Sequence, residues 1–480
     1  MRQLNNSTIE KPERPVRILQ FGEGNFLRAF FDPMIDEANR QGLIDASAVI
    51  VSPRFKDNTT IRNLRLQDGL YHVLLEGIDN GEARQSLSLV RSVADAFSPI
   101  SDPSLYKRYI TSPELRFVVS NTTEAGIVYE KENGSDLMAK SFPAKVAALL
   151  YHRFRHFNGD KSKGLIFLCC ELIEDNGQKL SEYVLRHAED AGLGGEFEEW
   201  VRESCIFCDT LVDRIVSGFP NDDIEKINRS TGFEDSLVVK GELYHLWVIG
   251  GKKATTVREE LPLDKAGMNV HFLPDVRAFR DKKVRVLNGS HTGMVPIALQ
   301  LGCETVKDAF GNADVNAFIN RMVEHEVLPM IDGNREELKQ FADGILERFY
   351  NPYIRHMLQS ISLNSLSKWE TRNFPTALDI WRTQKRLADY ELFTFAALLT
   401  LYAPDSGFSP EDDEDHLRYI RDSWSPEDIP GSVARIVGGT VFVHDFESLI
   451  PGFTAKVADY VACIRSMGMA SALKSFLTDN

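Results

Sequence analysis

The feature that most constrains the fold is a change of pattern near residue 280. Before it, short apolar runs rich in β-branched residues alternate with stretches of helical spacing. The strand candidates are 16–21, 48–51, 115–120 and 165–168, and the helix candidates are 26–39, 144–156 and 179–191. This alternation predicts a parallel sheet with helices on its faces. Two more runs, 71–76 and 86–93, predict additional antiparallel strands.

Beyond residue 280 the strand signals nearly vanish. Apolar residues recur at helical spacing over 306–325, 336–348, 353–363 and 387–401. A chain of 480 residues is long for a single core. We therefore predict two domains, an α/β domain over 14–278 and a mostly α-helical domain over 279–480.

Composition excludes several classes of function. The formal net charge of −15 argues against a nucleic-acid partner or an acidic membrane partner, because both require basic faces. No stretch reaches the roughly 18 apolar residues that cross a bilayer, and no apolar leader is recognisable, so we expect a cytoplasmic protein. Cys205 and Cys208 have zinc-like spacing but lack a second pair of ligands, so no metal site is predicted.

A glycine-containing turn follows the first predicted strand. The strand 16–21 runs into Gly22-Glu-Gly24-Asn-Phe-Leu27-Arg28, which opens a helical pattern. A strand, a Gly-x-Gly turn and a helix together bring backbone N–H groups against a pyrophosphate. The third glycine of the usual fingerprint is missing, because Leu27 stands in its place. We predict a dinucleotide site here, which makes the α/β domain a Rossmann-type dinucleotide-binding domain.

A second motif places an amine, an amide and an imidazole at short spacing. Lys283, Asn288 and His291 lie in a run that predicts the opening of a helix. At about 100° per residue, Lys283 and Asn288 lie roughly 140° apart, and Asn288 and His291 roughly 60° apart, so all three can line one side of a cavity. Hydride transfer to a carbonyl needs a proton donor and oxyanion donors, which this trio supplies. The alternative is an ordinary polar start of a helix.

Together the two motifs resemble the long-chain, metal-independent polyol dehydrogenase family, also called the mannitol dehydrogenase family. Lys283, Asn288 and His291 match its signature in full. The turn Gly22-x-Gly24-x-Phe26-x-Arg28-Ala29 is similar to its nucleotide loop, and Leu211-Val-Asp-Arg-Ile215 is similar to its inter-motif signature. The resemblance extends over nearly the whole chain. It implies a helical domain that carries the catalytic and substrate residues.

Four stretches resemble one branch of this family, which acts on sugar acids. They are 20–30, 117–127, 170–173 with Asn176-Gly177, and 351–354. The resemblance implies an NAD-dependent oxidoreductase that interconverts a keto-uronate, D-tagaturonate, and a sugar acid, D-altronate. The alternatives are a fructuronate, mannonate or polyol 2-dehydrogenase of the same family, or a non-catalytic nucleotide-binding protein.

The resemblance also implies roles for individual residues. Lys283 is the acid/base, Asn288 an oxyanion donor, and His291 positions the substrate. The expected contacts to NAD are Phe21, Gly22, Gly24, Asn25, Phe26, Arg28, Ser52, Asn121 and Thr122. The second strand, 48–51, is followed by Ser52 rather than an acid, and Arg54 could pair with the 2′-phosphate of NADP. We expect NAD, because the branch implies it.

Three further residues are candidates for the substrate site. Asp209 stands where polyol dehydrogenases often carry an Asn that holds the reacting oxygen, and a carboxylate cannot donate there unless it is protonated. Asp209 can instead stabilise the Lys283 ammonium. A uronate carboxylate needs cationic donors. Lys368 and Arg372 are the leading candidates, among four cationic residues that also include Arg355 and His356.

Overall fold

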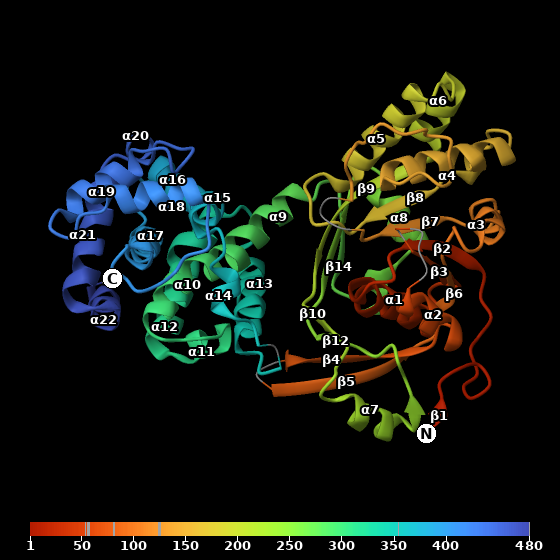
Figure 1. Cartoon of the computed structure of the whole chain (residues 1–480), viewed down its shortest axis with the longest axis horizontal. Coiled ribbons are helices and arrows are strands. Elements are labelled where there is room, and N and C mark those ends of the chain that lie inside the picture. Colours follow the sequence, from red (N-terminus) through yellow and green to blue (C-terminus); the bar gives the residue numbers. More distant parts are fainter. Residues whose placement is uncertain (53, 55–57, 80–81, 123–125, 354, 480) are drawn as a thin grey trace. The chain divides into compact units, whose positions relative to one another are not determined.

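A computed structural model describes residues 1–52, 54, 58–79, 82–122, 126–353 and 355–479. Of the motifs quoted above, residues 53, 123–125 and 354 lie outside the described residues. The chain divides into two compact units, Met1–Arg277 and Ala278–Asn480, shown from red to green and from green to blue in Figure 1. Each unit is described by itself.

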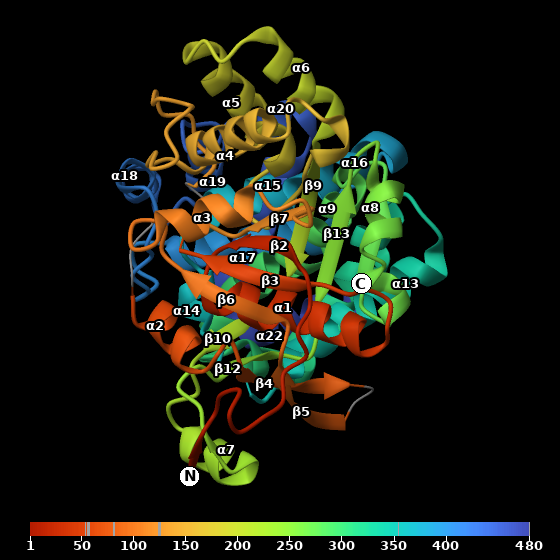
Figure 2. The same cartoon turned by 90° about the vertical axis from the view of Figure 1, so that its right-hand side faces the viewer.

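An eight-stranded sheet forms the centre of the first unit, in the order β14-β13-β9-β8-β7-β2-β3-β6. The strands are β2 (Val16–Phe21), β3 (Ser47–Val51), β6 (Val93–Phe97), β7 (Phe117–Ser120), β8 (Ile166–Cys169), β9 (Ile206–Asp213), β13 (Leu246–Gly250) and β14 (Val270–Leu273). All neighbours from β9 to β6 are parallel, whereas β13 runs antiparallel to β9. Figure 2 shows β6, β3, β2 and β7 side by side in this sheet, with β9 beyond them. From β6 to β9 this is the strand order of a doubly wound dinucleotide-binding sheet.

Alternation of side chains along the strands buries both faces of this sheet. Leu19 and Phe21 of β2 pack in one core with helices α3 (Pro103–Ile110), α4 (Phe142–His156), α5 (Asn176–Asp190) and α6 (Gly195–Ser204). Ile18 packs on the other face with α1 (Asn25–Arg40) and α8 (Ala254–Glu260). Apolar residues at helical spacing, including Leu27, Phe30 and Met34, give α1 its buried face. The sheet is therefore covered by helices on both sides.

Two smaller sheets complete the first unit. One has the order β10-β12-β4-β5, with β4 (Tyr71–Asp79), β5 (Glu82–Val90), β10 (Val216–Gly218) and β12 (Val239–Glu242). The antiparallel pairing of β4 and β5 confirms the two additional strands predicted from the sequence. The other sheet pairs β1 (Arg2–Gln3) with β11 (Phe233–Glu234). Helices α2 (Thr59–Leu66) and α7 (Ile224–Thr231) and short 3-10 turns at Lys161–Lys163 and Leu263–Ala266 make up the rest.

The second unit is helical, and its named elements contain no strand among the described residues. It begins within α9 (Arg277–Lys283), which is followed by a π-helical turn (Val284–Gly289) and α10 (Ser290–Gln300). Then follow α11 (Val306–Gly311), α12 (Ala313–Met322), a second π-helical turn (Val323–Val327), α13 (Arg335–Glu347), α14 (Leu358–Ile361), α15 (Ser365–Arg372) and α16 (Phe374–Gln384). The last are α17 (Asp389–Tyr402), α18 (Glu414–Ser423), α19 (Ile429–Val437), α20 (Phe446–Leu449), α21 (Phe453–Met467) and α22 (Met469–Asp479), with 3-10 turns at Leu328–Met330 and Arg348–Tyr350. Every residue of α17 from Tyr390 to Tyr402 is buried, so this helix is the centre of the core.

Two of the helices expected in the second unit are wrong in extent. The expected helix 306–325 is broken at Asn312, whose side chain accepts from the N–H groups of Asp314 and Val315 and so begins α12. Of the expected helix 353–363, only α14 (Leu358–Ile361) forms, because the backbone at His356 and Leu358 is hydrogen-bonded to Glu304 and Val306 instead. Val306 N donates to His356 O at 2.9 Å, and Leu358 N donates to Glu304 O at 2.9 Å. Long-range pairing overrides local helical periodicity here.

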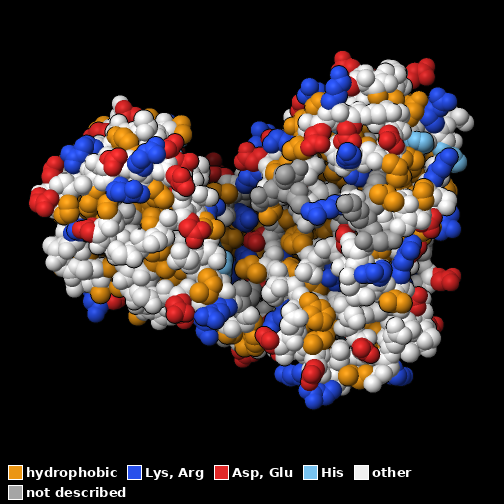
Figure 3. All heavy atoms as spheres, viewed as in Figure 1, with side chains coloured by type: hydrophobic (Ala, Val, Ile, Leu, Met, Phe, Trp, Pro, Cys, Tyr) orange, Lys and Arg blue, Asp and Glu red, His pale blue; other side chains and the backbone are white. Residues whose placement is uncertain are grey.

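The surface carries mixed charge. Figure 3 shows Lys and Arg side chains interspersed with Asp and Glu on the visible face of each unit. Within the described residues, no helix combines the length and the apolar content required to cross a bilayer.

Candidate active site

The turn after β2 has the shape that a dinucleotide site requires. Gly22 has φ +139°, a conformation that side chains rarely adopt, and a Cβ there would lie 3.2 Å from Asn121 O. Gly24 is different. Its φ of −66° suits any residue, it is exposed, and a Cβ there would meet nothing within 4 Å. Gly24 precedes α1, so open space lies directly beside the N-terminus of a 16-residue helix.

The carboxyl ends of the central strands meet around this turn. Phe21 pairs with Ser120 of β7 and Val51 of β3, so the strand order reverses at β2. Ligands of doubly wound sheets bind at such a switch point. Ser52, predicted to contact the cofactor, directly follows β3, and its N–H donates to Phe97 O at 3.1 Å.

Asn121 and Thr122 follow β7 and are held by the neighbouring strand end. The Asn121 amide donates to Cys170 O at 2.7 Å. The N–H and the hydroxyl of Thr122 both donate to the buried carboxylate of Glu171, each at 3.0 Å. Burial raises the pKa of Glu171, and the two donations from Thr122 oppose that shift. Glu171, for which no role was predicted from the sequence, therefore holds Thr122 in place.

Three predicted cofactor residues take supporting positions. The ring of Phe21 is fully buried against Phe142, so only its backbone faces the turn. Phe26 stacks on Phe30 at 4.9 Å between ring centroids. The buried Arg28 guanidinium donates to Glu23 O at 3.1 Å, to Leu237 O at 2.7 Å and to the exposed Asn25 side chain at 2.7 Å. Arg28 therefore braces the turn from inside the protein.

Glu23, the residue between the two glycines, reaches across to the second strand. Its Oε1 accepts from Asn58 Nδ2 at 2.6 Å and from Ser52 Oγ at 3.4 Å. Asn58 is itself fixed, because its Oδ1 accepts from Ile61 N at 3.0 Å and caps α2. From the sequence, Glu23 was only the variable position of the Gly-x-Gly turn.

Asp209 lies on β9 in the first unit and is hydrogen-bonded to a helix. Its Oδ1 accepts from Gln178 N at 3.0 Å, in the first turn of α5. The neighbouring Asn176 donates to Cys169 O, Glu171 O and Thr210 O, which ties the ends of β8 and β9 together. A Cβ on Gly177 would lie 2.3 Å from Cys208 O, so this glycine is required by packing. The Asn176-Gly177 pair is thus structural.

In the second unit, Lys283, Asn288 and His291 lie on one continuous helix with a π-helical turn inside it. Lys283 ends α9, Asn288 lies in the π-helical turn and His291 lies in the first turn of α10. The expectation of 140° between Lys283 and Asn288 assumed an α-helix and is wrong. Hydrogen bonds of the i→i+5 type widen the turn, so residues five apart come closer to one face. All three side chains are half-buried.

A buried amide supports the π-helical turn. Asn373 Nδ2 donates to Gly289 O at 3.1 Å and to Glu391 Oε2 at 2.8 Å. Glu391 is buried, and burial together with the nearby Glu326 carboxyl raises its pKa well above the usual range. The Asn288 side chain, by contrast, makes no hydrogen bond to another described residue. Asn373 thus holds the backbone of the π-helical turn, whereas the side chain of Asn288 remains available to a ligand.

His291 is held by aromatic contacts. Its ring stacks on Phe349 at 4.3 Å between centroids and meets His356 edge to face at 5.4 Å. Burial, followed by the positive charges of His356, Arg348 and Arg372, lowers its pKa well below the usual range. Its Nε2 is buried and has no hydrogen-bond partner among the described residues. His291 is therefore neutral at pH 7, with an unused ring nitrogen.

Lys368 and Arg372, one turn apart on α15, form a half-buried cationic pair beside α10. Arg372 Nη1 donates to the hydroxyl of Thr292, the residue after His291, at 3.3 Å. Burial lowers the pKa of Arg372; burial and then the Arg372 charge lower the pKa of Lys368. Arg355 differs, because it is exposed and pairs with Glu304 at 3.3 Å. The structure thus brings Arg372 to the Lys-Asn-His helix and leaves Arg355 at the surface.

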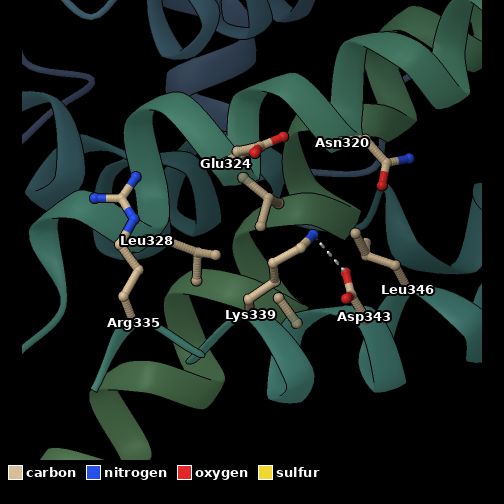
Figure 4. A pocket seen from close by; sticks show the side chains of 9 residues that line it. Asn320, Glu324, Leu328, Arg335, Lys339, Asp343 and Leu346 are labelled. Carbon is tan, nitrogen blue, oxygen red and sulfur yellow. Dashed lines mark hydrogen bonds and ion pairs between the residues drawn. The ribbon is translucent and has the colours of Figure 1, made fainter. Parts of the chain in front are cut away.

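A cavity between α12 and α13 lies apart from these residues. Figure 4 shows Asn320, Glu324 and Arg335 at its edge, and the ion pair of Lys339 with Asp343, 3.5 Å apart, along the wall that α13 forms. Its volume is about 60 Å³. Ligand pockets usually measure about 300–1,000 Å³, so this cavity is too small for a six-carbon sugar acid. Among the described residues, no three His, Cys, Asp or Glu side chains gather into a group that could hold a metal ion.

Comparisons with known proteins agree with this architecture. Residues 16–263 match the mannitol dehydrogenase Rossmann domain, and residues 275–415 match the mannitol dehydrogenase C-terminal domain. The chain is 41% identical to an altronate oxidoreductase of Bacillus subtilis, over 99% of this chain and 98% of that protein. It is 39% identical to the altronate oxidoreductase of Bacteroides thetaiotaomicron, over 99% of this chain and 100% of that protein.

Two solved structures share the fold at low sequence identity. A D-sorbitol dehydrogenase in substrate-free form superposes with a TM-score of 0.79 at 20% identity, covering 98% of this chain and 100% of that one. Mannitol 2-dehydrogenase of Pseudomonas fluorescens, in a ternary complex with NAD and D-mannitol, superposes with a TM-score of 0.67 at 20% identity, covering 98% and 95%. These matches confirm the predicted fold class, a Rossmann-type domain followed by a helical domain.

Proposed function

Because the chain belongs to the mannitol dehydrogenase family, we propose that it is an NAD-dependent oxidoreductase that interconverts D-tagaturonate and D-altronate. Membership of this family makes it an enzyme that acts on CH–OH groups. The observation that carries the proposal is the single helix that holds Lys283, Asn288 and His291, with Arg372 bonded beside it. The names of the full-length relatives, altronate oxidoreductases, support the choice of sugar acid.

The first unit fits a dinucleotide. Open space beside Gly24 lets a pyrophosphate approach the backbone N–H groups at the start of α1. Residues at the switch point, Ser52, Asn121 and Thr122, would hold the rest of the cofactor through backbone and side-chain polar groups. When bound, NADH supplies the hydride that reduces the ketone carbon.

In the second unit, the Lys283 ammonium gives a proton to the ketone oxygen during reduction, and the neutral amine takes a proton from the hydroxyl during oxidation. The Asn288 amide donates a hydrogen bond to the same oxygen as negative charge develops on it. His291, being neutral, orients a substrate hydroxyl through its ring. An ammonium and an amide suffice to polarise the carbonyl, so we propose a reaction that needs no metal.

Arg372 and Lys368 bind the substrate carboxylate. A half-buried guanidinium is a stronger partner for a carboxylate than a fully hydrated one, because less water competes for it. Arg372 uses one nitrogen on Thr292, which fixes the orientation of the remaining donors. An uncharged polyol or ketose gains nothing from this pair of cations.

The test is a panel of purified protein with D-tagaturonate, D-fructuronate and D-fructose, each with NADH and with NADPH, followed by cofactor absorbance. We expect the highest kcat/KM for D-tagaturonate with NADH, and unchanged activity after treatment with EDTA. Faster reduction of D-fructuronate would place the chain in the mannonate branch, and faster reduction of D-fructose would make it a polyol dehydrogenase. NADH binding without turnover of any substrate would make it a non-catalytic nucleotide-binding protein.

A further inference from the structure

Rossmann-type domains commonly choose NAD by an acidic residue at the end of the second strand, which accepts hydrogen bonds from the adenosine ribose. In this chain the second strand of the sheet, β3, is followed by Ser52, whose side chain is neutral. Arg54, close by, is exposed and has the charge that suits a 2′-phosphate. No acidic residue directly after β3 is therefore available to accept hydrogen bonds from the ribose hydroxyls.

The structure brings a carboxylate to this place from the glycine turn. Glu23 Oε1 lies 3.4 Å from Ser52 Oγ and 2.6 Å from Asn58 Nδ2. Asn58 is held by its cap on α2, and the Glu23 carbonyl is held by the buried Arg28. Both the backbone and the carboxylate of Glu23 are therefore fixed at the end of β3.

The second oxygen of the Glu23 carboxylate stays available. Oε2 makes no hydrogen bond to any described residue. A carboxylate has about four acceptor positions, and two of those on Glu23 are used within the protein. A half-buried carboxylate with one oxygen anchored and the other without a partner is suited to accept from a ligand hydroxyl.

We propose that Glu23 is the residue that selects NAD over NADP: it accepts hydrogen bonds from the hydroxyls of the adenosine ribose and repels a 2′-phosphate. This inference rests on the proposed function only in that a nicotinamide dinucleotide binds the first unit. Specificity arises from attraction of the diol and from repulsion of the phosphate dianion by the same carboxylate. Ser52 and Asn58 position the carboxylate.

The experiment is an equilibrium titration of the full chain with NADH and with NADPH, followed by cofactor fluorescence in the absence of substrate. Wild-type protein should bind NADH more tightly. Glu23→Gln keeps the shape and an oxygen for Asn58 but loses the charge, so the ratio of the two dissociation constants should shift toward NADPH by about tenfold or more. Glu23→Asp keeps the charge and should keep rejecting NADPH.

Glu37→Gln is the matched control, because Glu37 lies near the other end of α1 and pairs with Arg40. It removes the same charge and should leave both affinities unchanged. An unchanged NADH-to-NADPH ratio in Glu23→Gln overturns the inference while the proposed function stands. Wild-type protein that binds neither dinucleotide overturns both. Wild-type protein that prefers NADPH overturns the inference and identifies Arg54 as the residue to test.

Discussion

Asn373 donates its side-chain amide to the carbonyl of Gly289, at the end of the π-helical turn that carries Asn288. The same amide donates to the buried Glu391, so the turn is tied to the central helix α17. A π-helical turn is an unusual backbone that requires such external support. The spacing of Lys283, Asn288 and His291 therefore depends on a residue far away in the sequence.

The first prediction is that Asn373→Ala lowers both stability and kcat. Unfolding free energy should fall by about 1–3 kcal/mol, because a buried carboxyl loses its partner. Loss of the support should also misplace Asn288, so kcat should fall by about tenfold or more. Thermal unfolding and steady-state kinetics measure the two effects. Asn320→Ala, which removes a side-chain bond to Asn316 O on α12, should leave kcat unchanged; an equal loss of kcat in both variants would contradict a specific role.

The second prediction is that Lys283→Ala lowers kcat by about 10²–10⁴-fold while NADH binding remains. The physical reason is loss of the proton donor without any change in the dinucleotide site. An added primary amine at high pH should partly restore the rate. Lys282→Ala is the control, because Lys282 lies over the rings of Phe279 and Phe341. A Lys283→Ala enzyme that keeps more than about a tenth of wild-type kcat excludes this lysine as the acid/base.

The third prediction concerns Gly24, where a side chain would enter open space beside α1. Gly24→Val should fold normally and weaken NADH binding, because the side chain takes the place of the pyrophosphate. Gly195→Val, at the start of α6 and equally open, should leave NADH affinity unchanged. Circular dichroism checks the fold and fluorescence titration checks binding. Normal NADH affinity in Gly24→Val would show that the dinucleotide binds elsewhere.

The fourth prediction is that Arg372→Ala and Lys368→Ala reduce kcat/KM for the keto-uronate by about 10- to 150-fold, which corresponds to one lost charge-assisted contact. Reduction of D-fructose, which has no carboxylate, should change much less, and NADH binding should be normal. Arg355→Ala is the control, because this exposed cation pairs with Glu304. Equal losses for both substrates would make the α15 cations structural.

The fifth prediction concerns pH. Burial raises the pKa of Glu326 from 4.5 to about 7, although it accepts from the N–H groups of Tyr390 and Glu391. The unfolded chain releases this proton at lower pH than the folded chain, so the contribution of Glu326 to stability is complete below about 4.5 and is lost as pH rises to about 7. Glu326→Gln should therefore gain in melting temperature relative to wild type between pH 5 and pH 8, on the order of several degrees. Glu324→Gln, its exposed neighbour, should show no such trend.

The sequence alone predicted the parallel centre of the first unit, strands β2, β3, β7 and β8 with their covering helices, but it predicted neither β6, β9, β13 and β14 nor the antiparallel pairing of β13 with β9. Alternating runs of strand and helix spacing require a parallel sheet covered on both faces, and the Gly22–Gly24 turn marks its first strand. Both can be predicted from short segments, because the repeat of apolar side chains and the conformation of a glycine turn depend mainly on residues close by in the sequence. The placement of Lys283, Asn288 and His291 near the start of one helix was also predicted from the sequence, although their angular spacing was not.

Only the tertiary structure decided which side chains meet. The expected helix 353–363 was lost to backbone pairing with residues around Val306, and the α-helical angle between Lys283 and Asn288 was replaced by a π-helical turn that Asn373 supports. The approach of Glu23 to Ser52 follows from the parallel pairing of β2 and β3. Such contacts join residues far apart in the chain, and no local periodicity encodes them. The sequence therefore determined the elements and the reactive groups, while long-range packing fixed the geometry in which those groups can act.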